Sequence, residues 1–95
     1  MKNDIKYILN CSKKNFFVST YIKILENFVK NHNVKKHHTA HHYNRDVDVY
    51  KIEGITFSIS KGDNYKRVII FDNNNNLILD KKNIINKVEQ LTLGF

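Results

Sequence analysis

The spacing of apolar residues changes once along the chain, and this change limits the folds that the chain can adopt. Between residues 13 and 31 apolar residues recur at intervals of seven, as in Val18/Leu25 and Tyr21/Phe28, a spacing typical of an amphipathic helix. From Asp46 onward they alternate, which is typical of strands with one buried face. A helical first part followed by a strand-forming second part predicts an α+β domain.

The helical part divides into two predicted helices. Asn3 or Asp4 can cap a short helix that ends near Asn10, and Ser12 can cap a longer one over about 13–31. In the strand-forming part, DVDVYKI (46–52) and ITFSIS (55–60) flank Glu53-Gly54, which predicts a tight hairpin. This turn pairs Tyr50 with Phe57 on an apolar face. It also places Asp48 opposite Ile59, so we expect a bulge or an early end to the pairing.

The remaining elements follow from shorter patterns. The contiguous apolar residues of YKRVIIF (65–71) predict a central strand with both faces covered, and LIL (77–79) predicts a short strand. Asp80 can cap a final helix over about 81–91, with Ile84, Ile85, Val88 and Leu91 on one stripe. The predicted fold is a small single α+β domain over residues 1–95. It has two N-terminal helices, a three- to four-stranded antiparallel meander and a C-terminal helix packed on the sheet.

Length and composition favour a small cytoplasmic protein. The chain has 95 residues, enough for one modest hydrophobic core. It contains no apolar run long enough to span a bilayer, its first residues lack the order of a signal peptide, and Cys11 has no partner for an internal disulfide. We therefore expect no membrane association and location in the cytoplasm, which is the host cytoplasm if the protein is encoded by a phage.

The positive charge is concentrated in the first half of the chain. The net charge is +7, and residues 1–45 hold nine basic and two acidic residues, whereas residues 46–95 hold seven of each. Abundant Asn, Lys and Ile indicate an A/T-rich genome, which raises the lysine content along the whole chain. The asymmetry therefore needs a local cause, and a basic segment favours a polyanionic partner.

The segment KKHHTAHHY (35–43) combines four histidines with two lysines and a tyrosine. If it were helical, His37 with His41, or His38 with His42, would form a chelating pair for a transition metal. The two pairs would point about 100° apart, so one ion could not bind all four histidines. A polar connector and a basic recognition loop are the other interpretations.

The same segment resembles part of a toxin family. TAHHY (39–43), which follows YIKILENFVKNHN, is similar to the Gly-Ser-His-His stretch of HicA-type toxins, although Thr39 and Ala40 replace the glycine and serine. This resemblance implies a ribonuclease on a double-stranded-RNA-binding-like fold, with His41 or His42 as the catalytic histidine. A carboxylate and metal nuclease site, built from Asp46, Asp48 and Asp72 with Glu53 and Lys51 nearby, is a weaker alternative, because acidic residues at strand ends are common turn formers.

No convincing catalytic set emerges, so we favour a small, basic, non-enzymatic binding or inhibitor protein over an enzyme. We hypothesise a phage or mobile-element origin and a role such as that of an anti-CRISPR inhibitor of host defence. The partner would be nucleic acid, a nucleoprotein complex or an acidic protein surface, with no cofactor. The expected contact residues are Lys30, Lys35, Lys36, His37, His38, His41, His42, Tyr43 and Arg45. The apolar terminal residues Leu91, Leu93 and Phe95 could also serve a homodimer contact.

Overall fold

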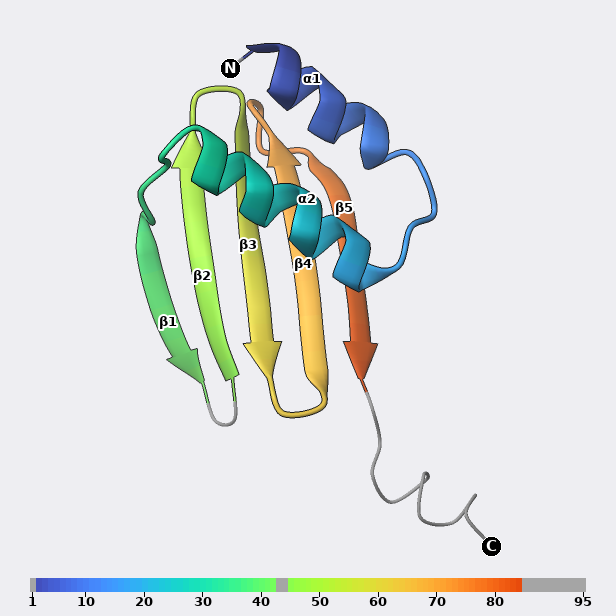
Figure 1. The fold of residues 1–95 in the computed structure, drawn as a ribbon, viewed down its shortest axis with the longest axis vertical. Helices are drawn as coiled ribbons and strands as arrows, with labels where there is room; N and C mark the ends of the chain where they lie inside the picture. Colours follow the sequence, from blue (N-terminus) through green and yellow to red (C-terminus); the bar gives the residue numbers. More distant parts are fainter. Residues whose placement is uncertain (1, 43–44, 85–95) are drawn as a thin grey trace, which may run out of the picture.

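The structure is a computed structural model that describes residues 2–42 and 45–84. Two helices are followed by five strands, and consecutive strands pair antiparallel in the order β1-β2-β3-β4-β5. Both helices lie on the same face of this meander (Figure 1). The elements are α1 (Lys2–Cys11), α2 (Val18–Asn31), β1 (His38–His42), β2 (Arg45–Ile52), β3 (Ile55–Gly62), β4 (Tyr65–Asp72) and β5 (Leu77–Ile84).

Each helix buries one apolar stripe. In α1 the buried residues are Ile5, Ile8 and Cys11, and in α2 they include Leu25 and Phe28, at the spacing that keeps side chains on one helix face. The second helix begins at Val18 and not near residue 13 as predicted. Neither helix in the described part of the chain has the length and apolarity that a membrane span requires.

The late start of α2 has a local cause in the segment between the helices. The Ser12 hydroxyl does not cap α2, because it donates a hydrogen bond of 2.8 Å back to the Ile8 carbonyl at the end of α1. The Tyr21 hydroxyl donates to the Cys11 carbonyl at 3.0 Å, and this bond ties the end of α1 to α2. Side-chain hydrogen bonds thus hold residues 12–17 outside either helix.

The predicted hairpin is confirmed, but its predicted irregularity is not. Gly54 adopts a positive φ of 107°, and Tyr50 pairs with Phe57 as expected. The pairing then continues without a bulge through Asp48 and Ile59 to the end of β2. Asp48 is tolerated opposite Ile59 because its carboxylate accepts a hydrogen bond of 2.9 Å from the Thr39 hydroxyl on β1.

The sheet has one covered face and one open face. On β4, Val68 and Ile70 are buried beneath the helices, whereas Ile69 and Phe71 on the other face are only partly buried. The prediction that both faces of this strand are covered is therefore wrong for the described residues. The core lies between the helices and the covered face, with Tyr21, Leu25, Phe57 and Val68 among its most buried side chains.

The strand count also differs from the prediction of three to four. Residues 81–84, which were expected to begin a helix, continue β5 and pair with β4 as far as Ile84 opposite Tyr65. Residues 80–84 form a strand despite the helix-capping residue Asp80, because their pairing satisfies the backbone N–H and C=O groups of β4. The rest of the predicted helix, including Ile85, Val88 and Leu91, lies outside the described residues, as do Leu93 and Phe95. The fifth strand is β1, which the histidine segment supplies.

Candidate nucleic-acid interface

The histidine segment forms an edge strand that extends the sheet beyond the helical layer (Figure 1). Side chains alternate along β1, so His38, Ala40 and His42 share one face while Thr39 and His41 share the other. All three of these histidines are exposed. Residues 38–42 are therefore neither a helix nor a loop, and their side chains are divided between two surfaces.

Acidic residues of β2 balance the basic residues on the helix-bearing side of β1. His41 Nδ1 lies 2.7 Å from the Asp46 carboxylate, and the Lys36 ammonium lies 3.7 Å from the Asp48 carboxylate. Both aspartates project from β2 toward the side that carries the helices, since they pair with Lys61 and Ile59 there. On this side the positive charge of the segment is partly neutralised, and the predicted contact residues do not act as one basic cluster.

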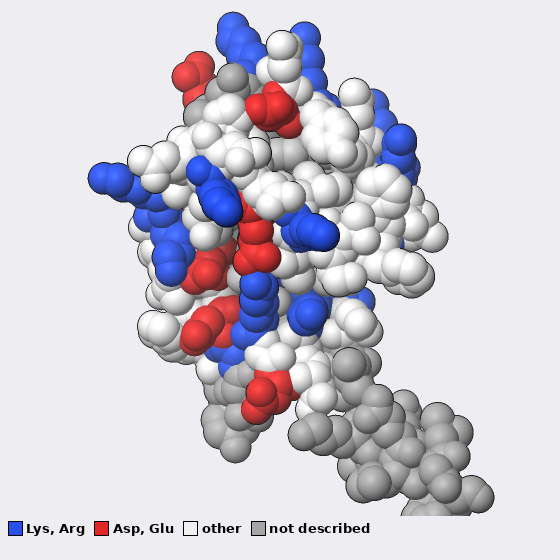
Figure 2. Space-filling model, in the orientation of Figure 1, with Lys and Arg blue, Asp and Glu red and all other residues white. Residues whose placement is uncertain are grey.

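Positive and negative side chains also alternate over the rest of the helix-bearing side (Figure 2). Lys61 on β3 forms an ion pair of 2.5 Å with Glu26 on α2, which lies above it. Lys30 is exposed near the end of α2, and Lys35 and His37 are exposed in the following connection. Tyr43 lies outside the described residues. This side offers no continuous basic surface among the residues that Figure 2 colours.

The opposite side of the sheet, which we call the open face, has a different composition. Within residues 2–42 and 45–84, no helix covers it (Figure 1). The strand registers assign its members row by row. They are His38, Ala40 and His42 on β1, Arg45, Val47, Val49 and Lys51 on β2, Thr56, Ser58, Ser60 and Gly62 on β3, Tyr65, Arg67, Ile69 and Phe71 on β4, and Leu77, Asp80 and Lys82 on β5.

Arg45 and Tyr65 form a contact at one end of the open face. The two residues lie on either side of Gly62 in the same row, and the Arg45 guanidinium carbon is 4.3 Å from the centre of the Tyr65 ring. Because Gly62 has no side chain, the arginine can reach across β3 onto the ring. Arg45 Nε is buried and has no hydrogen-bond acceptor among the described residues. Arg45 was predicted from sequence, whereas Tyr65 was not.

Arg67 and Asp80 form a second contact farther along the same face. Arg67 Nε and Nη2 donate to the two oxygens of Asp80 at 2.8 and 2.6 Å, a bidentate arrangement. The hydrogen bonds from Arg67 hold the pKa of Asp80 below its usual value, and they raise the pKa of Arg67. Each side chain is about one third exposed, so the pair remains accessible from solution.

The open face is both basic and apolar. Arg45, Lys51, Arg67 and Lys82 face one acidic residue, Asp80, among the described members, and His38 and His42 add imidazoles at the edge. Between these polar groups lie partly exposed apolar and aromatic side chains. These are Val47, Val49, Ile69, Phe71 and Leu77, of which Leu77 is 57% exposed. Arg67, Phe71 and Lys82 were not predicted from sequence. The alternation within YKRVIIF could nevertheless have placed Tyr65, Arg67 and Phe71 on one face.

The helical spacing that would make His38 and His42 a chelating pair is absent, because both residues lie on the strand β1. Residues four apart in a strand lie roughly 13 Å apart, so His38 and His42 cannot bind one ion together. No group of three or more His, Cys, Asp or Glu side chains with metal-site geometry occurs among the described residues. Asp72 accepts hydrogen bonds from the backbone N–H groups of Asn74 and Asn76 at 2.8 and 2.9 Å. It therefore acts as a turn former at the end of β4.

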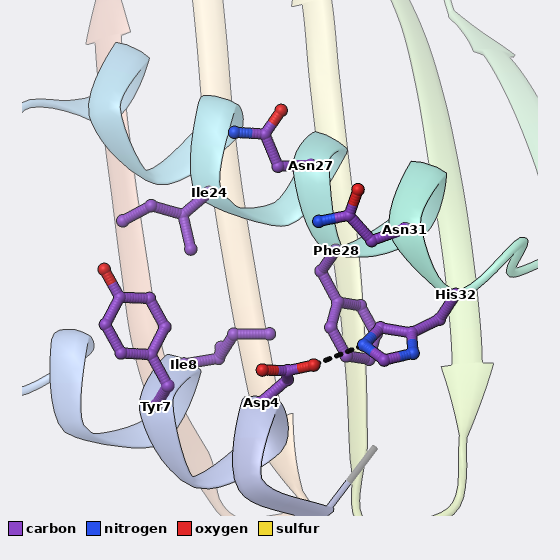
Figure 3. A pocket seen from close by; sticks show the side chains of 8 residues that line it. All are labelled: Asp4, Tyr7, Ile8, Ile24, Asn27, Phe28, Asn31 and His32. Atoms are coloured by element: carbon purple, nitrogen blue, oxygen red, sulfur yellow. Dashed lines mark hydrogen bonds and ion pairs between the residues drawn. The ribbon is translucent and has the colours of Figure 1, made fainter.

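A small pocket lies between the two helices (Figure 3). Its volume is about 190 Å³, below the usual range for small-molecule sites. Asp4 and His32 point toward one another across it and share a hydrogen bond, which links α1 to the end of α2. This pair is better explained as a tie between helices than as a binding site. The pocket is lined by Asp4, Tyr7, Ile8, Ile24, Asn27, Phe28, Asn31 and His32.

Comparison of the chain with family models, with curated proteins and with solved structures found no significant match.

Proposed function

We propose that the protein is a non-enzymatic nucleic-acid-binding protein, whose open face and adjoining edge strand contact the phosphates. The observation that carries this proposal is the separation of charge across the sheet. Arg45, Lys51, Arg67 and Lys82 extend on the open face, while Asp46 and Asp48 project to the other side of β2. A ligand on the open face would meet cations with a single carboxylate among them.

The residue types on the open face suit phosphate recognition. An arginine presents several N–H donors in a fixed plane, and each lysine that neutralises a phosphate releases a counterion from the nucleic acid. His38 and His42 add imidazole nitrogens at the edge of this face. Lys35, together with Lys30 at the end of α2, extends the positive charge beside β1. A nucleoprotein complex, including one that serves host defence, could present the same phosphates.

Fluorescence anisotropy with a labelled single-stranded oligonucleotide tests this function. Four phosphate contacts predict that the logarithm of the association constant falls with the logarithm of the salt concentration with a slope of about −3. An affinity that does not change with the salt concentration, or no binding at 50 mM salt, would contradict the proposal.

A second candidate function is metal-independent RNA cleavage, which the resemblance to HicA-type toxins implies. The observation in its favour is the hydrogen bond of 2.7 Å between His41 and Asp46, because a carboxylate of this kind can orient an imidazole for general base catalysis. The described residues form a five-stranded meander, which differs from the double-stranded-RNA-binding-like fold that the resemblance implies. Incubation with RNA in EDTA decides between the two functions. Cleavage that His41→Ala abolishes and His38→Ala preserves would establish the ribonuclease.

A further inference from the structure

The open face contains a row of alternating aromatic, basic and apolar side chains along β4. Tyr65, Arg67, Ile69 and Phe71 all project from this strand on the side opposite the helices. We propose that the ligand of the open face is a single-stranded nucleic acid whose bases stack along this row, between Tyr65 and Phe71. This inference rests on the proposed function, and it adds the strandedness of the ligand and the residues that contact its bases.

The dimensions of the row suit a short single-stranded segment. Tyr65 and Phe71 are six residues apart on one strand, which corresponds to roughly 20 Å. Two aromatic side chains at this separation can contact bases at the two ends of a segment a few nucleotides long. Arg67 lies between them, where its guanidinium can meet a phosphate or stack on a base.

The apolar surface is what favours a single strand over a duplex. Phe71 is partly exposed and pairs in register with Leu77, which is 57% exposed. A duplex presents phosphates and keeps its bases stacked inside, so it would leave this apolar surface without a contact. Unpaired bases cover aromatic and apolar side chains while their phosphates reach the neighbouring cations, as in other single-strand platforms.

The neighbouring strands leave space for such a ligand. On β3 the open-face residues are small, with Ser58 beside Ile69 and Ser60 beside Arg67. Ser60 is nevertheless buried, because the side chains beside it in the row, Val47 and Arg67, are longer. On β5, Lys82 lies beside Arg67 and places an exposed ammonium next to the row. Cations therefore flank the stacking positions on β4 from both sides, with Arg45 reaching Tyr65 from β2.

An abasic oligonucleotide provides the most direct test, because it keeps the phosphates and lacks the bases. Anisotropy is measured at one salt concentration with single-stranded DNA, single-stranded RNA, duplex DNA and an abasic strand of equal length. We expect both kinds of single strand to bind about tenfold more tightly than the abasic strand and the duplex. The ratio of RNA to DNA affinity then reports whether the ribose hydroxyl is also contacted.

Matched leucine variants locate the stacking. Phe71→Leu keeps an apolar side chain and should weaken single-strand binding about fivefold to tenfold, with no effect on the abasic strand. Phe17→Leu is the control, because Phe17 is 83% exposed at the start of α2, away from the open face. Circular dichroism shows whether each variant folds, and Tyr65→Leu replaces Phe71→Leu if the latter does not.

The outcomes separate this inference from the proposed function. Salt-dependent binding that is equal for the abasic strand and for DNA would overturn stacking and keep phosphate binding. Preference for the duplex would also overturn the inference. No binding to any of the four ligands would contradict both the stacking inference and the proposed function. A dimer in light scattering that Phe71→Leu dissociates would likewise overturn it, since the open face would then contact a second copy of the chain.

Discussion

The two arginines of the chain lie on the open face, and each has a different partner. Arg45 lies over the Tyr65 ring, whereas Arg67 makes a bidentate ion pair with Asp80. A lysine would not make the same contacts, because only a planar guanidinium has a flat face to lay against a ring and two parallel N–H groups to donate to a carboxylate. Arg45 thus has its guanidinium available for a phosphate, while Asp80 occupies two of the donors of Arg67.

This difference predicts that Asp80→Asn strengthens nucleic-acid binding. The substitution frees Arg67 and removes the acidic residue that the described part of the open face contains, so we expect a severalfold higher affinity for single-stranded DNA at 100 mM salt. Glu26→Gln makes the same change in charge in the ion pair with Lys61 on the helix-bearing side, away from the row, and is the control. An unchanged or lower affinity for Asp80→Asn would contradict the arrangement.

The same substitution should lower stability in a pH-dependent way. The hydrogen bonds from Arg67 lower the pKa of Asp80, so this residue stabilises the folded state above the ordinary aspartate pKa of about 4. The contribution is lost as the pH falls through the lower pKa of the folded state. For a pair that is one third exposed we expect about 0.5–1 kcal/mol at pH 7. Urea denaturation of both proteins at pH 7 and near pH 2 measures the difference, which should disappear in acid.

At the scale of elements, the sequence predicts those whose own pattern determines them. The helices and the β2–β3 hairpin follow from spacing and from Glu53-Gly54, and the apolar stretch of β4 identifies that strand. The first strand and the second part of β5 do not follow, because neither His38–His42 nor Asp80–Ile84 has a strand pattern of its own. Both become strands by pairing with β2 and β4, which is a tertiary effect that a local pattern does not contain.

The candidate site likewise contains some residues that the sequence identifies and others that only the strand pairing brings to it. Arg45 and the histidines could be selected from sequence because basic residues are concentrated before residue 46. Lys82 and Phe71 belong to the neutral half of the chain, and they join Arg45 only through the strand registers. The register also separates His41 from His42, which are adjacent in sequence, onto opposite sides of the sheet.

The turn between β4 and β5 depends on one side chain, and this predicts a second pH effect. The backbone and side chain of Asn76 donate to the Asp72 carboxylate, and these hydrogen bonds lower the pKa of Asp72. We expect Asp72→Ala to lower the urea midpoint at pH 7. The difference from the unmodified protein should vanish as the pH falls through the lowered pKa of Asp72, where this residue loses its charge. Asn73→Ala in the same turn is the control, and an equal loss from it would contradict the role of Asp72.

At the scale of the whole molecule, the sheet separates two surfaces that carry different mixtures of charge. Helices and ion pairs such as Lys61–Glu26 occupy one side, and cations with apolar side chains occupy the other. The net charge of +7 alone would attract any polyanion to either side. The proposed function requires more than this, because contact must be confined to the open face.

Lys82 and Lys66 allow this requirement to be tested with one change in charge. Both are exposed and they lie on neighbouring strands, but Lys82 faces the open side with Arg67, whereas Lys66 faces the helix-bearing side with Lys61. At 150 mM salt we expect Lys82→Glu to weaken single-strand binding about tenfold and to reduce the salt slope by about 0.7, the loss of one phosphate contact. Lys66→Glu should change the affinity less than about twofold, since screening limits its effect at a distance. Equal losses from the two variants would show that net charge, and not the open face, determines binding.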